Sequence, residues 1–301
     1  MKKFLLYLLL LVLGVAILDG VNRLIVQAAY AHLPENSELR RNFKYTTPCD
    51  AELLVLGASR GVYDYNTVMM ADSLHVTCKS IAMEGMSVIS QYISVNKAVA
   101  GGKTKTIIYD IAQVQLSDDW VLNQMSRYYP FYWENEDVKA FVDEQQGKKM
   151  NFLLASSFVQ YNSTLFDILY TGYVRKTDDD KGFIPLEYTG KEFVLDPEQR
   201  QPTPMVVNPV GAEYLQKIVD VCKENNIRLI LCDAPRAKYW NQQNDIYLQD
   251  FAGKNGIEFW NYSDYEPIVS DMRYFYDIVH INGPAADIFT KSLIERLRDT
   301  K

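Results

Sequence analysis

Short apolar runs alternate with amphipathic stretches along most of the chain, and this alternation predicts strands that are each followed by a helix. The apolar runs are typical of buried parallel strands, and the stretches between them have the apolar spacing of helices. The predicted strands span residues 52–56, 76–83, 105–111, 227–232 and 257–262. The predicted helices span residues 66–74, 88–100, 211–225, 242–255 and 284–298. We therefore expect an α/β protein, a three-layer α/β/α sandwich around a mostly parallel five-stranded sheet.

The first thirty residues follow a different pattern. Lys2 and Lys3 precede an apolar run from Phe4 to Leu18, which Asp19 ends. One interpretation is a cleaved signal peptide with Ala29-Tyr30-Ala31 as the processing site. The other, which we favour because that site lies far from the end of the run, is an uncleaved membrane anchor. Either way, the two lysines predict a cytoplasmic N-terminus at the inner membrane and a body that faces the periplasm or the cell exterior.

Composition narrows the class of protein. With 48% hydrophobic and 23% charged residues, the chain is expected to bury a core in a domain from 51 to 301, after a polar tether at 31–50. The formal net charge of −7 argues against nucleic acid as the main partner. The four cysteines, Cys49, Cys78, Cys222 and Cys232, show no metal-ligand spacing, and their pairing is left open. No glycine-rich nucleotide loop occurs, so no cofactor or metal is expected.

The candidate chemistry starts at the end of the first predicted strand. There the chain reads Gly57-Ala58-Ser59-Arg60-Gly61, a turn that can present a hydroxyl at the carboxyl end of a strand. Ligands of open α/β sheets bind outside the carboxyl ends of the strands, so Ser59 is a candidate nucleophile. The alternative is a strand-to-helix turn in which Ser59 only caps the next helix.

A base for Ser59 follows by elimination, since the chain has three histidines. His32 lies in the tether, and His75 precedes the second strand, at the opposite end of the sheet. His280 follows the last strand, with Asp277 three residues earlier. A D-x-x-H sequence lets the carboxylate hold one imidazole nitrogen while the other accepts a serine proton. We therefore predict Ser59, Asp277 and His280 as catalytic residues; the alternative for His280 is a histidine that only hydrogen-bonds the backbone.

Two known arrangements resemble these blocks. Residues 57–61 match the G-x-S-x-G elbow of α/β-hydrolases, but there the serine follows a central strand, and the acid and histidine lie on separate loops. A serine after the first strand and a closing D-x-x-H instead resemble the SGNH (GDSL-like) hydrolase superfamily. Three further features resemble the exported bacterial members of this superfamily that work with membrane-bound O-acyltransferases. They are the N-terminal anchor, the insertion described below and the sequence after the third strand, which lacks the asparagine that the superfamily usually has there.

The resemblance implies a flavodoxin-like α/β fold and a site for acyl transfer. It assigns the oxyanion hole to the amides of Ser59 and Gly85. Members of the superfamily usually add an asparagine side chain from the loop after the third strand; this chain has no asparagine there, and Gln113 is the candidate substitute. It implies an esterase or O-acetyltransferase acting on acyl esters of cell-surface glycans. The missing asparagine motivates the alternative, an inactive accessory module that binds glycan or a membrane-bound O-acyltransferase.

The alternation of strands and helices breaks between about residues 113 and 207, which are aromatic, charged and irregular. Helical pieces are predicted around 138–144 and 151–170. We interpret this region as an insertion that covers one face of the site. Its aromatic side chains could bind a sugar or could simply pack together.

Overall fold

The computed structural model describes residues 1–33, 48–111, 116, 125–162, 164–173, 182–194, 207–237 and 242–300. The chain divides into two compact units. The first consists of Met1–Thr46 and Met125–Asp178, and the second of Thr47–Gln124 and Asp179–Lys301. The second unit contains the whole β-sheet, and the first contains the N-terminal helix together with part of the predicted insertion.

The second unit is built on five parallel strands in the order β2-β1-β3-β4-β5. The strands are β1 (Leu53–Leu56), β2 (Cys78–Ser80), β3 (Thr106–Asp110), β4 (Arg228–Asp233) and β5 (Glu258–Asn261). In the three central strands, Val55 of β1 lies opposite Ile108 of β3, and Ile108 lies opposite Ile230 of β4. The expected α/β fold with a parallel five-stranded sheet is confirmed. The second strand is shorter than predicted because β2 is an edge strand that pairs only with β1.

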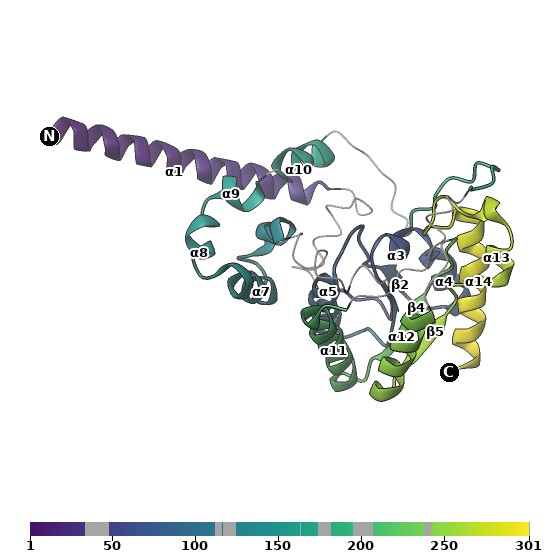
Figure 1. Ribbon diagram of the computed structural model, residues 1–301. Helices are drawn as coiled ribbons and strands as arrows, with labels where there is room; N and C mark the ends of the chain where they lie inside the picture. The colour runs from purple at the N-terminus through teal and green to yellow at the C-terminus, as the bar shows by residue number, and fades with distance from the viewer. Residues whose placement is uncertain are drawn as a thin grey trace. The chain divides into compact units, whose positions relative to one another are not determined.

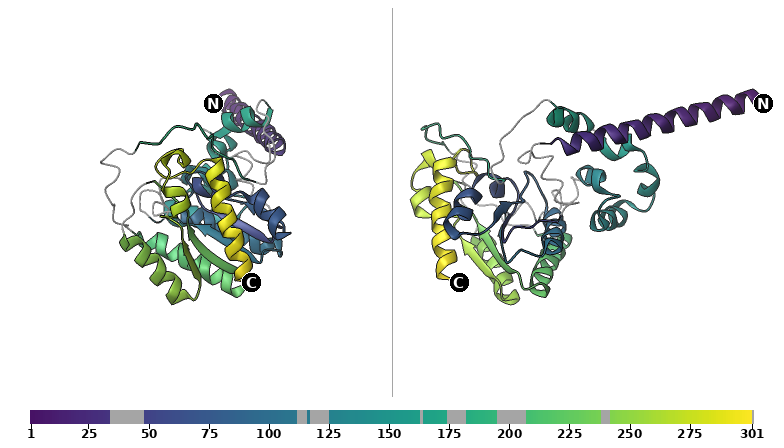
Figure 2. Two further views of the ribbon diagram at one scale, coloured as in Figure 1. Left: turned by 90° about the vertical axis from the view of Figure 1, so that its right-hand side faces the viewer. Right: turned by 180° about the vertical axis from the view of Figure 1, so that it is seen from behind.

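Helices cover both faces of this sheet (Figures 1 and 2). The helices of one face are α4 (Thr67–Leu74) and α14 (Gly283–Asp299), and those of the other are α5 (Val88–Gly101), α11 (Pro209–Glu224) and α12 (Gln242–Asn255). Asparagine side chains cap three of them: Asn66, Asn208 and Asn282 accept hydrogen bonds from first-turn amides of α4, α11 and α14. These caps fix where each helix begins after its preceding loop.

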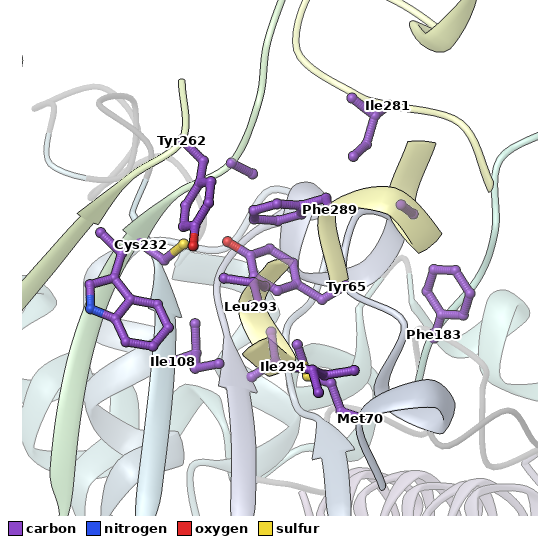
Figure 3. Close-up of a cluster of buried hydrophobic side chains, with 14 of the residues drawn as sticks. Tyr65, Met70, Ile108, Phe183, Cys232, Tyr262, Ile281, Phe289, Leu293 and Ile294 are labelled. Atoms are coloured by element: carbon purple, nitrogen blue, oxygen red, sulfur yellow. The ribbon is translucent and has the colours of Figure 1, made fainter. Parts of the chain in front are cut away.

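The core between the sheet and α14 is aromatic and aliphatic (Figure 3). Tyr65 and Tyr262 each make an edge-to-face contact with Phe289 of α14, with ring centroids 5.1 and 5.2 Å apart. Trp260 of β5 is buried in the same cluster. These contacts hold the last helix, and with it the loop that precedes it, against the sheet.

The first unit surrounds the end of the N-terminal helix α1 (Lys2–Ala31). Its other elements are η3 (Met125–Arg127), η4 (Tyr129–Phe131), α7 (Glu136–Gln146), α8 (Met150–Leu153), α9 (Ser157–Tyr161) and α10 (Thr164–Tyr173). α1 packs against α9 and α10 (Figure 1). Near its end Val26, Ala29 and Tyr30 are buried, and the Tyr30 ring lies 6.2 Å from that of Phe131.

The sequence pattern is less accurate within the insertion. The helical piece predicted around 151–170 is three short helices, α8 to α10, because the chain turns at residues 154–156 and at Asn162, where φ is +35°. Residues 182–194 belong to the second unit: Ile184 donates a backbone hydrogen bond to Val62, and Gly283 donates one to Leu186. Thus part of the insertion lies along the unit that carries the sheet, whereas 125–173 belongs with α1. That the insertion covers the site stays a prediction.

Candidate active site

The structure brings together the three residues that the sequence singles out. The Nε2 atom of His280 lies 2.7 Å from the hydroxyl oxygen of Ser59, and its Nδ1 atom lies 2.7 Å from a carboxylate oxygen of Asp277. Ser59 and His280 are 221 positions apart, so this contact is a product of the fold. The arrangement of hydroxyl, imidazole and carboxylate is that of a nucleophile activated by an oriented base.

Ser59 is held at the start of a short helix that the sequence pattern does not predict, α3 (Ser59–Tyr63). The turn from β1 into this helix depends on Gly57, whose φ is +146°. A β-carbon at Gly57 would come within 3.0 Å of Asp110 on β3. One turn further, a β-carbon at Gly61 would come within 2.6 Å of that of Ala82. The two glycines thus let the turn that carries Ser59 pack tightly between the end of β3 and the loop that follows β2.

Asp277 and His280 share one tight loop before α14. One oxygen of Asp277 accepts hydrogen bonds from the amides of Val279 and His280, at 2.8 and 2.9 Å, and the other faces His280 Nδ1. Partial burial favours a higher pKa for Asp277, but these hydrogen bonds outweigh it and lower that pKa below its usual value. Asp277 is therefore an anion at neutral pH and favours the His280 tautomer that presents a bare Nε2 to Ser59.

Residues near the triad tie it to the loop after β2. The ring of Tyr63, on α3, meets the His280 ring edge to face, with centroids 5.5 Å apart. The Tyr63 hydroxyl donates a hydrogen bond to Glu84, the residue before Gly85. Gly85 itself adopts a left-handed conformation with φ of +66°. Its assignment to the oxyanion hole stays a prediction, and Gln113 lies outside the described residues.

Below Ser59 lies a buried network of charges that the sequence analysis missed. Arg60 points away from solvent and donates through Nε to Asp110 at 3.0 Å and through Nη1 to Asp233 at 2.9 Å. It also donates to the backbone carbonyls of Ile111 and Ala234. Through Arg60 the nucleophile helix is therefore bonded to the carboxyl ends of both β3 and β4.

Other partners complete this network. Asp110 also accepts from the Tyr65 hydroxyl at 2.9 Å, and Asp233 accepts from Arg236 at 2.8 Å. Burial alone favours a lower pKa for Arg60, but the carboxylates of Asp110 and Asp233 outweigh it and raise that pKa. Burial raises the pKa of Asp110, and Arg60 only partly opposes the rise. One signal was available in the sequence: aspartates end both the third and the fourth strand.

The two histidines that the sequence analysis set aside lie on other elements of the fold. His75 caps the end of α4 in a left-handed conformation, just before β2, and His32 follows α1 in the first unit. None of the four cysteines, all of which lie in the described part of the chain, forms a disulfide; Cys49 is half-buried and the others are buried. Among the described residues, no three His, Cys, Asp or Glu side chains are grouped to hold a metal ion.

Comparisons with known proteins give structural neighbours only. No protein-family model matches the chain, and no curated protein matches it. In structure the chain is similar, at low sequence identity, to several solved proteins. One is described as an acylhydrolase from Bacteroides fragilis, at 14% identity over 86% of this chain and 94% of that one, with a TM-score of 0.41.

Two further neighbours are as distant. A GDSL-like lipase from Bacteroides thetaiotaomicron is 13% identical over 84% of this chain and 90% of its own, with a TM-score of 0.39. A Streptococcus protein described as a platelet activating factor is 10% identical over 95% and 99%, with a TM-score of 0.44. Similarity this low does not establish an activity, so we argue the function from the contacts of this chain.

Proposed function

We propose that the protein is a serine ester hydrolase of the SGNH type, with Ser59 as nucleophile, His280 as general base and Asp277 as the group that orients His280. The observation that carries this proposal is the pair of 2.7 Å contacts on the two nitrogens of His280. In the acylation step, His280 takes the proton of Ser59 as its oxygen attacks the ester carbonyl. The same proton then passes to the departing alcohol, which leaves an acyl-enzyme.

The position of Ser59 supports electrostatic stabilisation of the intermediate. Ser59 is the first residue of α3, so no carbonyl within that helix accepts from its amide. An amide in this place can donate to the developing oxyanion, and one such donor is typically worth about 3 kcal/mol. The amide of Gly85 is the proposed second donor. Gly85 lies in the turn after β2, and a hydrogen bond from the Tyr63 hydroxyl to Glu84 ties this turn to α3.

The finer proposal concerns the acyl group and its acceptor. By resemblance, we take the ester to be an acetyl ester of a cell-surface glycan, with water or a sugar hydroxyl as acceptor and a membrane-bound O-acyltransferase as partner. Hydrolysis and transfer share the acyl-enzyme and differ only in the acceptor. The N-terminal helix contains an 18-residue stretch with a mean hydropathy of 2.6, which supports placement at a membrane.

The test is covalent labelling of the full-length chain in detergent with a fluorophosphonate, read by intact mass. We expect one adduct on the wild type and none on Ser59→Ala or His280→Ala. The matched control is Ser270→Ala, which removes an exposed hydroxyl of the same unit and should leave labelling unchanged. Turnover of p-nitrophenyl acetate should follow the same order. No adduct on the wild type would refute the proposal and favour the inactive accessory module.

A further inference from the structure

We propose that the first unit is embedded in the outer surface of the lipid bilayer, around an N-terminal helix that is not cleaved. The surface concerned, which we call the apolar collar, consists of Phe152, Leu153, Phe158, Val159, Phe166 and Tyr170. These side chains lie on α8, α9 and α10 and are exposed, Phe152 by 85% and Phe166 by 75%. On α10, Phe166 and Tyr170 are one turn apart and share a face, and Ile168 is buried.

The composition of this segment fits lipid contact. Residues 150–173 contain a single charged side chain, Asp167, in a chain that is 23% charged. Exposed aromatic and aliphatic side chains on short helices that carry a single charge, Asp167, are unfavourably hydrated in water. At the boundary of a bilayer they bury apolar area, and such helices commonly lie about 5–10 Å deep.

The length of α1 places the collar at that depth. Phe4–Leu18 covers only about 22 Å at about 1.5 Å per residue, whereas a hydrocarbon core is about 30 Å thick. Exposed apolar side chains continue on α1 at Val21, Leu24 and Ile25, and a span that ends at Ile25 reaches about 33 Å. Asp19 then lies about 9 Å below the end of the span.

Contacts within the first unit explain how α1 tolerates polar groups at this depth. Asp19 accepts hydrogen bonds from the Ser156 hydroxyl at 2.7 Å and the Ser157 amide at 2.8 Å. Arg23 donates to the Gln160 side chain and to the carbonyl of Ala155, both at 2.8 Å. Polar groups inside a bilayer are costly unless they are paired, and here α9 and the two residues before it supply the partners.

These contacts also set the depth of the collar and oppose cleavage of α1. Phe158 and Val159 directly follow Ser157, so they lie level with Asp19 and share its depth. The end of α1 forms part of the core of the same unit, where Ala29 is fully buried and Tyr30 contacts Phe131 and Tyr161. Processing at Ala29-Tyr30-Ala31 would remove this part of the core.

The test uses a polarity-sensitive fluorophore on single cysteines of the full-length chain. In a Cys49→Ser background, which removes the one cysteine that is not buried, Phe152→Cys and Phe166→Cys carry the probe. The matched control is Ile246→Cys, an exposed apolar position of the second unit. The chains are reconstituted in vesicles of phosphatidylethanolamine and phosphatidylglycerol. Lipids spin-labelled near the top or near the end of the acyl chain then quench the probe.

We expect a blue shift at 152 and 166 and stronger quenching by the shallow spin label, with water-like emission at 246. Emission at 152 and 166 that matches the control would overturn the proposal, as would an equal shift at all three positions. Shielding that appears only at a high protein-to-lipid ratio would assign the collar to contact with a second copy instead. Intact mass supplies the independent check: a membrane-extracted chain that begins after Ala31 would refute the uncleaved anchor.

Discussion

Arg60→Met tests whether the charges below Ser59 act as one structural unit. The Arg60 side chain is 5% exposed and joins Asp110 and Asp233, both fully buried. Without the guanidinium, Asp233 keeps Arg236 as a cationic partner. Asp110 loses the guanidinium and keeps two neutral donors, the Tyr65 hydroxyl at 2.9 Å and the Ala234 amide at 3.3 Å. The substitution therefore takes the Arg60 ion pair away from one fully buried carboxylate, that of Asp110.

The expected loss follows from that single charge. Removing one partner of a buried ion pair typically costs about 3–5 kcal/mol of unfolding free energy. With a denaturant slope of about 2 kcal/mol per molar urea, the midpoint of unfolding should fall by about 1.5–2.5 M. The loss should shrink as the pH is lowered, because Asp110, whose pKa burial already raises, then takes up a proton in the folded state.

Two double variants make the prediction specific. Arg60→Met with Asp110→Asn should recover most of the lost stability, because the buried carboxylate that lost its Arg60 ion pair is itself removed. Arg60→Met with Asp233→Asn should not recover it, since that change leaves Asp110 ionised and takes the carboxylate from Arg236. Pulse proteolysis across a urea series on the full-length chain measures the midpoints. Equal stability of the two double variants would refute the assignment of the cost to Asp110.

Three further outcomes are expected. Asp277→Asn should lower kcat/KM for p-nitrophenyl acetate by about 10⁴-fold without unfolding, because an amide oxygen can still accept from Val279 and His280. Asp64, whose pKa burial raises well above its usual value, should make the folded state less stable as the pH rises above the ordinary aspartate range. Asp64→Asn should flatten that slope in urea midpoints measured from pH 4 to 8, and an unchanged slope would contradict the assignment. Gly57→Ala should lower stability by about 1–3 kcal/mol, seen as a lower Tm, because its φ is +146° beside Asp110.

Much of the second unit could be predicted from local pattern alone. The strands are buried apolar runs, and α12 has the predicted bounds, because burial and helix caps act over a few residues. α3 could not be predicted, since its five residues carry a glycine and have no apolar period. It forms because Asp64 at its end accepts from Ile281 and Arg60 bonds to β3 and β4. These are contacts between distant parts of the chain.

The triad could be predicted because its members have few rivals. Only one histidine follows the last strand, and the D-x-x-H spacing places a carboxylate beside it. The ionic network could not be predicted in this way. Arg60 follows Ser59 in a turn, where an arginine is expected to be exposed. The sequence does not show that its side chain points inward. The division of the insertion between two units likewise depends on packing rather than on composition.

The contrast in exposure between Ser59 and its neighbours explains why a charged network lies under the site. As the proposed nucleophile, Ser59 has to be reachable by an ester and so cannot be fixed by burial; the residue is half-exposed. Arg60, the next residue, is buried and bonded to two strands, so it fixes the start of α3 from below. Reacting groups lose rate steeply when they are displaced by about 1 Å. An apolar side chain at position 60 could fill the same space but would not specify direction, whereas the forked guanidinium sets both the height and the rotation of the helix.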